Sequence, residues 1–246
     1  LEEHLKAMEE QEVQLRNAIA TKDKFSSIMA HDLKNPVSSI MGFSQLLSGE
    51  IHTREPEEVK TFAEEIYKSS ERLHNLLTSL TQWSKSQEGS IQPNKESFPL
   101  NKLFAQNIEL QKLPMDQKEQ KISSSCHSAL TVFADFNMMD TVIRNLLSNA
   151  IKFTPKDGSI ELSASQDGDT VIIQVSDTGQ GMNEEEQAKL FRIDQSFSTE
   201  GTEGEKGTGM GLIIVQEFVV KNGGEISVQS AKSKGTTFTI QLPKIN

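Results

Sequence analysis

The chain has 246 residues, which is enough for two modest domains that each bury a core. It carries 35 acidic against 25 basic residues and a net charge of −10, which argues against nucleic acid or an anionic membrane as its main partner. Its single cysteine, Cys126, excludes an intrachain disulfide and fits a reducing compartment.

The first part of the chain has helical periodicity. Residues 1–20 are charged and place apolar side chains three and four apart, which predicts a weak coiled coil. No run approaches the roughly 18 apolar residues of a membrane span, and nothing resembles a signal peptide. Because the chain begins at Leu1 in the middle of a helix, we expect a longer protein with further sequence upstream.

Residues 21–88 predict a helical hairpin. The first helix runs to about Ser48, and its apolar stripe is formed by Phe25, Met29, Leu33, Pro36, Ile40, Phe43 and Leu47. The second helix, from Glu57 to about Ser86, has a stripe formed by Val59, Phe62, Ile66, Ser69, Leu73, Leu76, Leu80 and Trp83. A lone hairpin cannot close two apolar stripes, whereas two hairpins form a four-helix bundle, so we expect a homodimer.

One histidine on the first helix lies off the apolar stripe. His31 is two residues from both Met29 and Leu33, so it points to the surface. Asp32 can accept its ring NH and leave the other nitrogen as a nucleophile, and Asn35 lies one turn on, on the same face. Taken alone, the stretch is better interpreted as a solvated helix with a stray histidine.

A polar linker is expected over residues 89–97, and residues 98–246 mix helices and strands. Helices are expected at Leu100–Lys112, Asp135–Phe153, Asn183–Phe191 and Thr208–Asn222. Strands are expected at Lys121–Ser125, Thr131–Ala134, Ser159–Ser165, Thr170–Ser176, Glu225–Ser230 and Thr236–Leu242. The pattern predicts an α/β two-layer sandwich with one helical layer on a mixed sheet.

A polar stripe interrupts the second of these helices. Asn145, Asn149 and Lys152 lie at i, i+4 and i+7 on an otherwise apolar helix. Neutral amide oxygens can bind Mg²⁺ beside phosphate oxygens, and a lysine one turn later can meet the phosphate charge. By itself, this spacing fits a solvated helix face equally well.

An acidic residue and two glycines follow the strand 170–176. Val171, Ile173 and Val175 face inward, so by parity Asp177 also faces inward. An adenine amino group can supply the donor that such a carboxylate needs, and Gly179 and Gly181 let the backbone approach a base. A simple turn that closes the strand explains the glycines but leaves Asp177 without a partner.

A second glycine-rich sequence opens the last helix. Gly207, Thr208, Gly209, Gly211 and Leu212 belong to G-T-G-M-G-L, where backbone NH groups and the positive end of the helix dipole can cradle phosphate. No strand leads directly into it and G-x-x-x-x-G-K-[ST] is missing, which argues against Rossmann and P-loop sites. The preceding segment, 191–206, predicts a mobile lid over the nucleotide.

The sequence H-D-L-K-N-P, residues 31–36, resembles the phosphoacceptor box of bacterial sensor histidine kinases. Later motifs resemble the N box, two glycine boxes with an F box between them, and the last glycine box, residues 235–238, of the Bergerat-type (GHKL) ATP fold. The resemblance implies that His31 is phosphorylated by ATP and that Asp32 is its acid/base partner. It also implies that Asn35 is linked to phosphatase activity and that a response-regulator receiver domain takes up the phosphoryl group.

The same resemblance implies roles in the ATP domain. Asn149 would bind Mg²⁺, Asn145 and Lys152 would contact phosphates, Phe153 would pack on the base and Asp177 would hold the adenine amino group. The other nucleotide-binding positions that it implies are Gly179, Gly181, Lys206, Gly207, Thr208, Gly209, Gly211, Leu212 and Thr237. The F box, residues 191–195, departs from the commoner form with two phenylalanines and an aromatic-Arg pair, so Arg192 and Lys206 are both candidates for the cation at the γ-phosphate.

The predicted function is therefore an ATP-dependent protein histidine autokinase that also acts as phosphatase of the phospho-receiver. The alternatives are a Bergerat-type ATPase clamp, which needs a glutamate on the N-box helix, and a nucleotide-binding dimeric scaffold without kinase activity. We expect the chain to be the cytoplasmic portion of a larger sensor, with no membrane contact of its own.

Overall fold

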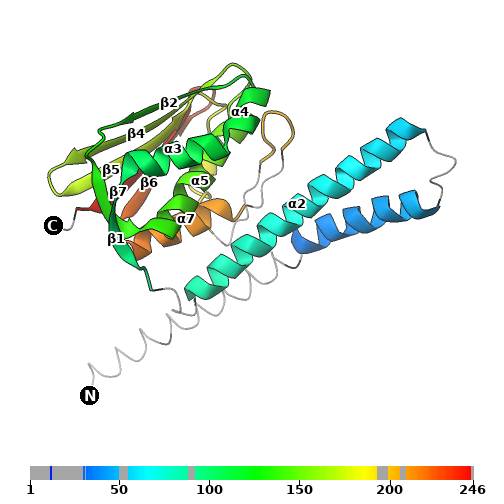
Figure 1. The fold of residues 1–246 in the computed structure, drawn as a ribbon, viewed down its shortest axis with the longest axis horizontal. Coiled ribbons are helices and arrows are strands. Elements are labelled where there is room, and N and C mark those ends of the chain that lie inside the picture. Colours follow the sequence, from blue (N-terminus) through cyan, green and yellow to red (C-terminus); the bar gives the residue numbers. More distant parts are fainter. Residues whose placement is uncertain are drawn as a thin grey trace. The chain divides into compact units, whose positions relative to one another are not determined.

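A computed structural model of the chain describes residues 12, 30, 32–49, 55–87, 92–192, 199–205 and 209–244 (Figure 1). The chain divides into two compact units, a helical one that ends at Ser84 and an α/β one that begins at Lys85. The coiled coil over 1–20 lies outside the described residues apart from Glu12, so it stays a prediction. Within the ranges given above, no helix is both long and apolar enough to cross a membrane.

The helical unit is a hairpin of a helix over residues 32–49 and α2, Pro56–Gln87 (Figure 1). Glu57 and Glu58 occupy the first turn of α2, where carboxylates favour the positive end of the helix dipole. The ring centroids of Phe43 and Phe62 lie 5.6 Å apart, so the two rings pack between the two helices. The predicted seam residues of α2 with described side chains are all buried or half-buried: Val59, Phe62, Ile66, Ser69, Leu73, Leu76 and Leu80.

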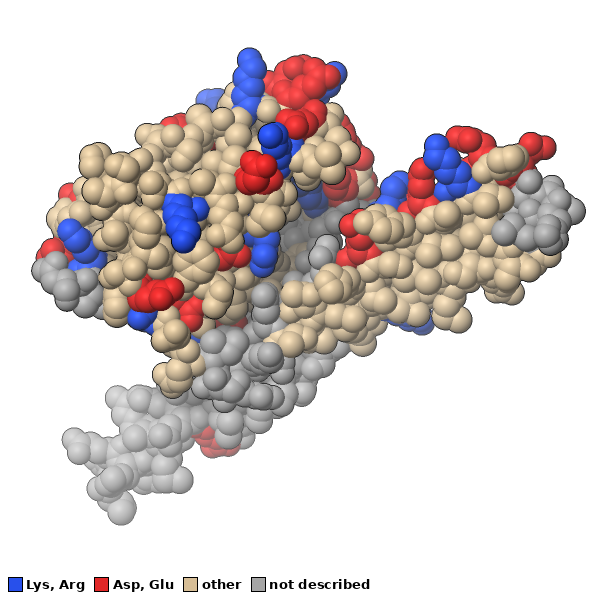
Figure 2. All heavy atoms as spheres, in the orientation of Figure 1, with Lys and Arg blue, Asp and Glu red and all other residues tan. Residues whose placement is uncertain are grey.

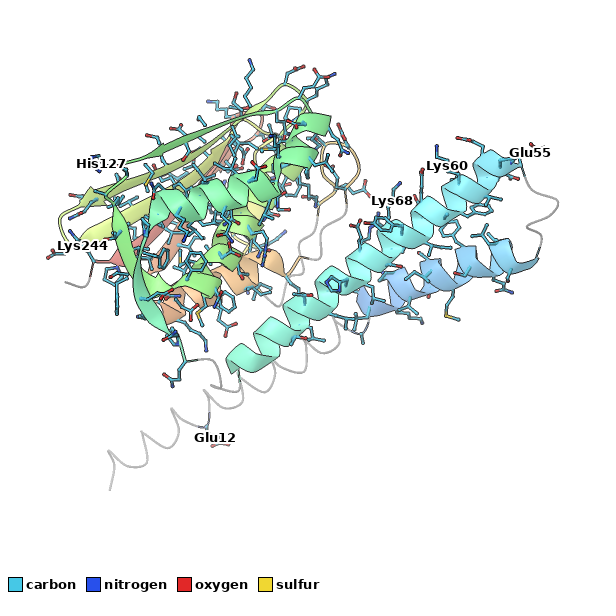
Figure 3. The ribbon with its side chains drawn as sticks, in the orientation of Figure 1. Glu12, Glu55, Lys60, Lys68, His127 and Lys244 are labelled. Carbon is cyan, nitrogen blue, oxygen red and sulfur yellow. The ribbon has the colours of Figure 1, made fainter. Side chains whose placement is uncertain are left out.

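Charged side chains lie away from that seam. Lys60 and Lys68 project from α2 (Figure 3) and pair with Glu57 and Glu65 at 3.9 and 3.1 Å. Figure 2 shows the same division, with a broad face of the hairpin free of Lys, Arg, Asp and Glu and charged residues gathered along its edge. Exposed pairs of this kind add little stability, so packing along the seam must hold the hairpin together.

The α/β unit is built on a five-stranded mixed sheet with the order β2-β4-β5-β7-β6. β2 is parallel to β4, and the other pairs are antiparallel. The strands are β2 (Lys121–Cys126), β4 (Ser159–Asp167), β5 (Thr170–Asp177), β6 (Glu225–Ala231) and β7 (Gly235–Pro243). Alternate side chains of β5 and β7 are buried, so one face of the sheet forms a core.

Three helices cover that face: α3 (Leu100–Leu110), α5 (Phe136–Phe153) and α7 (Gly211–Lys221) (Figure 1). α5 lies between the other two and contacts both. It begins at Asp135, whose Oδ1 accepts the Met138 NH at 2.9 Å and caps the helix. The predicted two-layer sandwich is therefore confirmed.

The structure differs from the sequence prediction in three short elements. A strand, β1 (Lys95–Pro99), begins inside the predicted linker and pairs with β3 (Thr131–Asp135). A separate short helix, α4 (Lys112–Gln117), follows α3. The helix expected to reach Phe191 is limited to α6 (Glu184–Gln187). Asn183 and Glu186 form a capping box at its N-terminus.

Candidate active site

The polar stripe of α5 is partly open to solvent. Asn145, Asn149 and Lys152 are half-buried, whereas the neighbouring apolar positions of the helix are buried. Asn145 Nδ2 donates to the Thr141 carbonyl at 2.8 Å, and a Cβ atom added at Gly211 would lie 2.7 Å from Asn145 Oδ1. The amide stripe of α5 therefore lies beside the first residue of α7.

Lys152 is the last residue of the stripe and lies in the last turn of α5. Its Nζ donates to the Thr199 carbonyl at 2.9 Å and lies 4.5 Å from the centre of the Phe153 ring. Burial lowers the pKa of Lys152, and the nearby carboxylates of Glu205 and Glu200 oppose that shift. A cation with little water around it interacts strongly with an incoming phosphate.

Asp177, at the end of β5, is a partly buried carboxylate. Its Oδ1 accepts the NH of Gly179 at 2.8 Å and the NH of Thr236 at 3.2 Å. Burial raises the pKa of Asp177 from 3.8 to about 6, although both backbone bonds oppose the shift. In the described part of the chain no donor reaches Oδ2, so this oxygen can accept a hydrogen bond from a ligand.

The glycines that follow Asp177 have no room for side chains. A Cβ atom at Gly179 would collide with the Phe153 carbonyl oxygen and would lie 2.7 Å from Asp177 Oδ1. Gly181 has a φ of 60°, and its Cβ atom would overlap the Ala231 carbonyl. The chain after β5 can therefore lie close against the end of α5 and the Asp177 side chain.

The N-terminus of α7 is a candidate anion site. Met210 at its N-cap makes no side-chain capping bond, and the first turn holds no acidic residue. α6 is the opposite case, since a capping box satisfies its first NH groups. Gly209 and Leu212 lie at this end of α7, whereas Lys206, Gly207 and Thr208 are outside the described residues.

Of the two threonines in the last glycine box, Thr236 lies beside Asp177. Thr236 pairs with Asp177 across β7 and β5 and donates its NH to the carboxylate. Thr237 points to the other face of the sheet, where its hydroxyl lies 2.8 Å from Ser176 Oγ. The alternation of Phe238, Ile240 and Leu242 was already visible in the sequence and places Thr236, not Thr237, on the core face.

The predicted phosphoacceptor helix is described at Ala30 and from Asp32 onward, and His31 lies outside the described residues. Asp32 is half-buried and Asn35 is exposed, one turn apart on the helix over 32–49. Pro36 is buried within the same helix. The assignment of His31 as acceptor therefore remains a prediction from the sequence.

Magnesium would fit the amide stripe. Asn149 offers a neutral, half-buried oxygen ligand, which suits Mg²⁺ that is held mostly by phosphate and water. Across the described ranges, no group of three or more His, Cys, Asp or Glu side chains forms an alternative metal cluster.

Comparison with known families matches both units. Residues 21–89 match the His Kinase A (phospho-acceptor) domain, and residues 134–246 match the histidine kinase-, DNA gyrase B- and HSP90-like ATPases. The chain is 32% identical over 234 residues to the circadian input-output histidine kinase CikA of Synechococcus elongatus, covering 92% of the chain and 30% of that protein. It is 29% identical over 224 residues to the sensor protein SrrB of Staphylococcus aureus, covering 91% of the chain and 38% of SrrB.

Solved structures show the same fold. The histidine kinase ThkA, in its complex with the response regulator TrrA, matches with a TM-score of 0.71 and 23% identity over 96% of this chain and 66% of that one. The Acinetobacter baumannii histidine kinase AdeS matches with a TM-score of 0.70 and 20% identity over 88% of this chain and 98% of that one. The chain spans only about a third of the length of CikA and SrrB. With its phosphoacceptor hairpin followed by a GHKL-type ATPase domain, the chain belongs to the sensor histidine kinases.

Proposed function

We propose that this chain is the autokinase core of a two-component system, in which His31 takes the γ-phosphoryl group of ATP. The observation that carries the proposal is that three features able to bind a nucleotide lie along the C-terminal half of α5. These are the amide stripe with Lys152, the Asp177 carboxylate, and the glycine-containing N-terminus of α7. The stripe and the helix N-terminus fit the phosphates, and Asp177 fits the adenine base.

In the proposed reaction, the free imidazole nitrogen of His31 attacks the γ-phosphorus, a P–N bond forms, and the P–O bond to ADP breaks. Asp32 accepts the proton of the other ring nitrogen. When bound, Mg²⁺ neutralises phosphate charge, and Asn149 is the residue that would hold it. The other residues position the nucleotide, since phosphoryl transfer depends mainly on alignment and charge neutralisation.

The structure argues against the ATPase clamp. Such a clamp needs a carboxylate on α5 that activates water, and α5 has a single acidic residue, Asp140. Its carboxylate accepts the Asn107 amide at 2.9 Å and lies 3.6 Å from Arg144, so it is already occupied away from the amide stripe. Water activation therefore has no candidate base on this helix.

Incubation with γ-labelled ATP tests the proposal. Wild type should acquire a label that acid removes and base does not, and His31→Gln should lose that label while ATP binding persists. A label that survives in His31→Gln would contradict the assignment of His31. ATP binding or hydrolysis without any protein label would instead support a scaffold or a clamp.

We further propose that the phosphoryl group passes to an aspartate of a cytoplasmic response-regulator receiver domain and that Asn35 helps to remove it again. The exposed amide of Asn35 lies one turn from His31 in sequence, where it can orient a water molecule without ionising. The complex of ThkA with a response regulator supports the choice of partner.

Asn35→Ala should leave autophosphorylation nearly intact but slow receiver dephosphorylation about ten-fold, equivalent to about 1.4 kcal/mol of transition-state stabilisation. The decay of purified phospho-receiver, followed with ADP present, measures this effect. Equal decay rates with wild type and variant would remove Asn35 from the mechanism.

A further inference from the structure

A buried lysine lies outside every nucleotide motif. Lys118 follows α4 directly, and only 3% of its surface is exposed. A lysine is rarely buried this completely unless its charge is paired, because burial of an unpaired ammonium is costly. The partners of Lys118 should therefore indicate what this charge does.

Those partners come from two segments far apart in the sequence. At the end of α5, Lys118 Nζ donates to the carbonyls of Ile151 and Lys152, both at 3.2 Å. From the segment 199–205 it meets Thr202 Oγ1 at 2.8 Å and the Glu205 carboxylate at 2.5 Å. One ammonium thus joins the C-terminal turn of α5 to the segment that leads into the second glycine box.

The electrostatics favour a charged pair. The last carbonyls of α5 lack partners within the helix and lie at the negative end of its dipole, where a cation is stabilising. Burial acts to raise the pKa of Glu205, but the bond from Lys118 and two backbone donors outweigh it and hold the pKa below its usual range. The Glu205 carboxylate is therefore ionised at neutral pH.

The segment 199–205 is folded closely around this pair. Thr202 donates its NH to the Lys152 carbonyl at 3.0 Å and its hydroxyl to the Thr154 carbonyl at 3.1 Å. The NH of Glu203 donates to Glu205 Oε2 at 2.8 Å. In the same segment, the Thr199 carbonyl accepts Lys152 Nζ.

We infer that Lys118 is a positioning residue for the nucleotide site. It fixes the segment 199–205 against the last turn of α5, and so sets the position from which the chain enters the second glycine box. That turn carries Lys152 and Phe153, which the proposed function assigns to phosphate and base. Lys118 has no assigned contact with the nucleotide and acts through the two segments that it joins.

Glu205→Gln is the sharpest test, because it removes the carboxylate charge from a side chain that is 36% exposed while keeping its shape. In the full chain, ATP titrated in the presence of Mg²⁺ should bind about ten-fold more weakly. Amide hydrogen exchange should accelerate selectively at 199–205, and the urea midpoint should change little. Lys118→Met should weaken ATP binding at least as much, and the double variant should be no worse than Lys118→Met alone.

Lys156→Met provides the matched control. Lys156 pairs with Glu119 at 2.7 Å in the same region, but both side chains are more than half exposed. This variant should bind ATP as wild type does. The inference rests on the ATP site proposed above. If wild type does not bind ATP in the same titration, the proposed site is wrong; if wild type binds and the variants bind equally well, only the role of Lys118 is wrong.

Two results would overturn the inference. One is ATP affinity within two-fold of wild type for both Glu205→Gln and Lys118→Met. The other is a pattern in which only Lys118→Met binds ATP more weakly, and does so with a lower urea midpoint, while amide exchange at 199–205 is unchanged in Glu205→Gln. Lys118 would then stabilise the fold without positioning the segment.

Discussion

Asp177 shows how a single buried carboxylate can oppose stability. Its pKa in the folded chain, about 6, lies above the ordinary value of 3.8 because burial disfavours the charge. The native state therefore holds the proton more tightly than the unfolded chain. The stability that this proton contributes is fully present below pH 3.8 and is lost as the pH rises through about 6.

Asp177→Asn should reverse that cost. The amide oxygen can still accept the NH groups of Gly179 and Thr236, and the side chain has no charge to bury. Above pH 7 the variant should be more stable than wild type by up to about 3 kcal/mol, the equivalent of roughly two pKa units, and the difference should vanish near pH 4. Urea unfolding at both pH values measures it.

The same substitution should weaken ATP binding at least ten-fold, about 1.4 kcal/mol, because the amide nitrogen would point a donor at the adenine amino group. Calorimetric titration at pH 7 measures the affinity. Unchanged affinity would disprove the adenine contact, whatever happens to stability.

Strand alternation predicts the position of Asp177, but the sequence does not predict the contacts of Lys118. Strand parity correctly placed Asp177 on the core face. The same rule, applied to β7, would have selected Thr236 rather than Thr237 as the neighbour of Asp177. Nothing in the sequence around Lys118 distinguishes it from a solvated lysine, since its partners lie more than 30 residues away.

At the scale of elements, long periodic segments were predicted well. The strands of the sheet and the helices α3, α5 and α7 lie within a few residues of their expected positions, because their apolar repeats reflect the core that they share. β1 was missed because four of its five residues, all except Phe98, are not buried and its polar sequence is typical of a linker. Its pairing with β3 is a tertiary contact that no local pattern encodes.

At the scale of the whole molecule, the hairpin supports the proposed homodimer. Several of its apolar side chains remain exposed, between 39% and 67%: Val37, Met41, Leu46 and Leu77. Together with the broad uncharged face in Figure 2, they provide the surface that a second hairpin would cover. One chain contributes two of the four helices that such a bundle needs.

Leu73→Asp with Leu76→Asp should disrupt this dimer. Leu76 is 4% exposed and Leu73 is half-buried, so both charges would enter an apolar seam. We expect the dissociation constant to rise at least 100-fold, about 2.7 kcal/mol, as measured by sedimentation equilibrium. Thr78→Asp, at an exposed position of α2, is the matched control and should remain dimeric. A wild type that is monomeric at micromolar concentration would count against the architecture.

The capping group of α5 has a mechanical consequence. While Asp135 Oδ1 caps α5, its Oδ2 accepts the NH of Asn94 at 2.8 Å, just before β1. Lys95 is tied in turn to the C-cap of α7 by a bond from its Nζ to the Asn222 carbonyl at 3.0 Å. A pull on the chain where it enters the domain must therefore break these bonds or carry the ends of α5 and α7 with it. Tension applied there would reach the two helices beside the proposed nucleotide site without crossing the sheet.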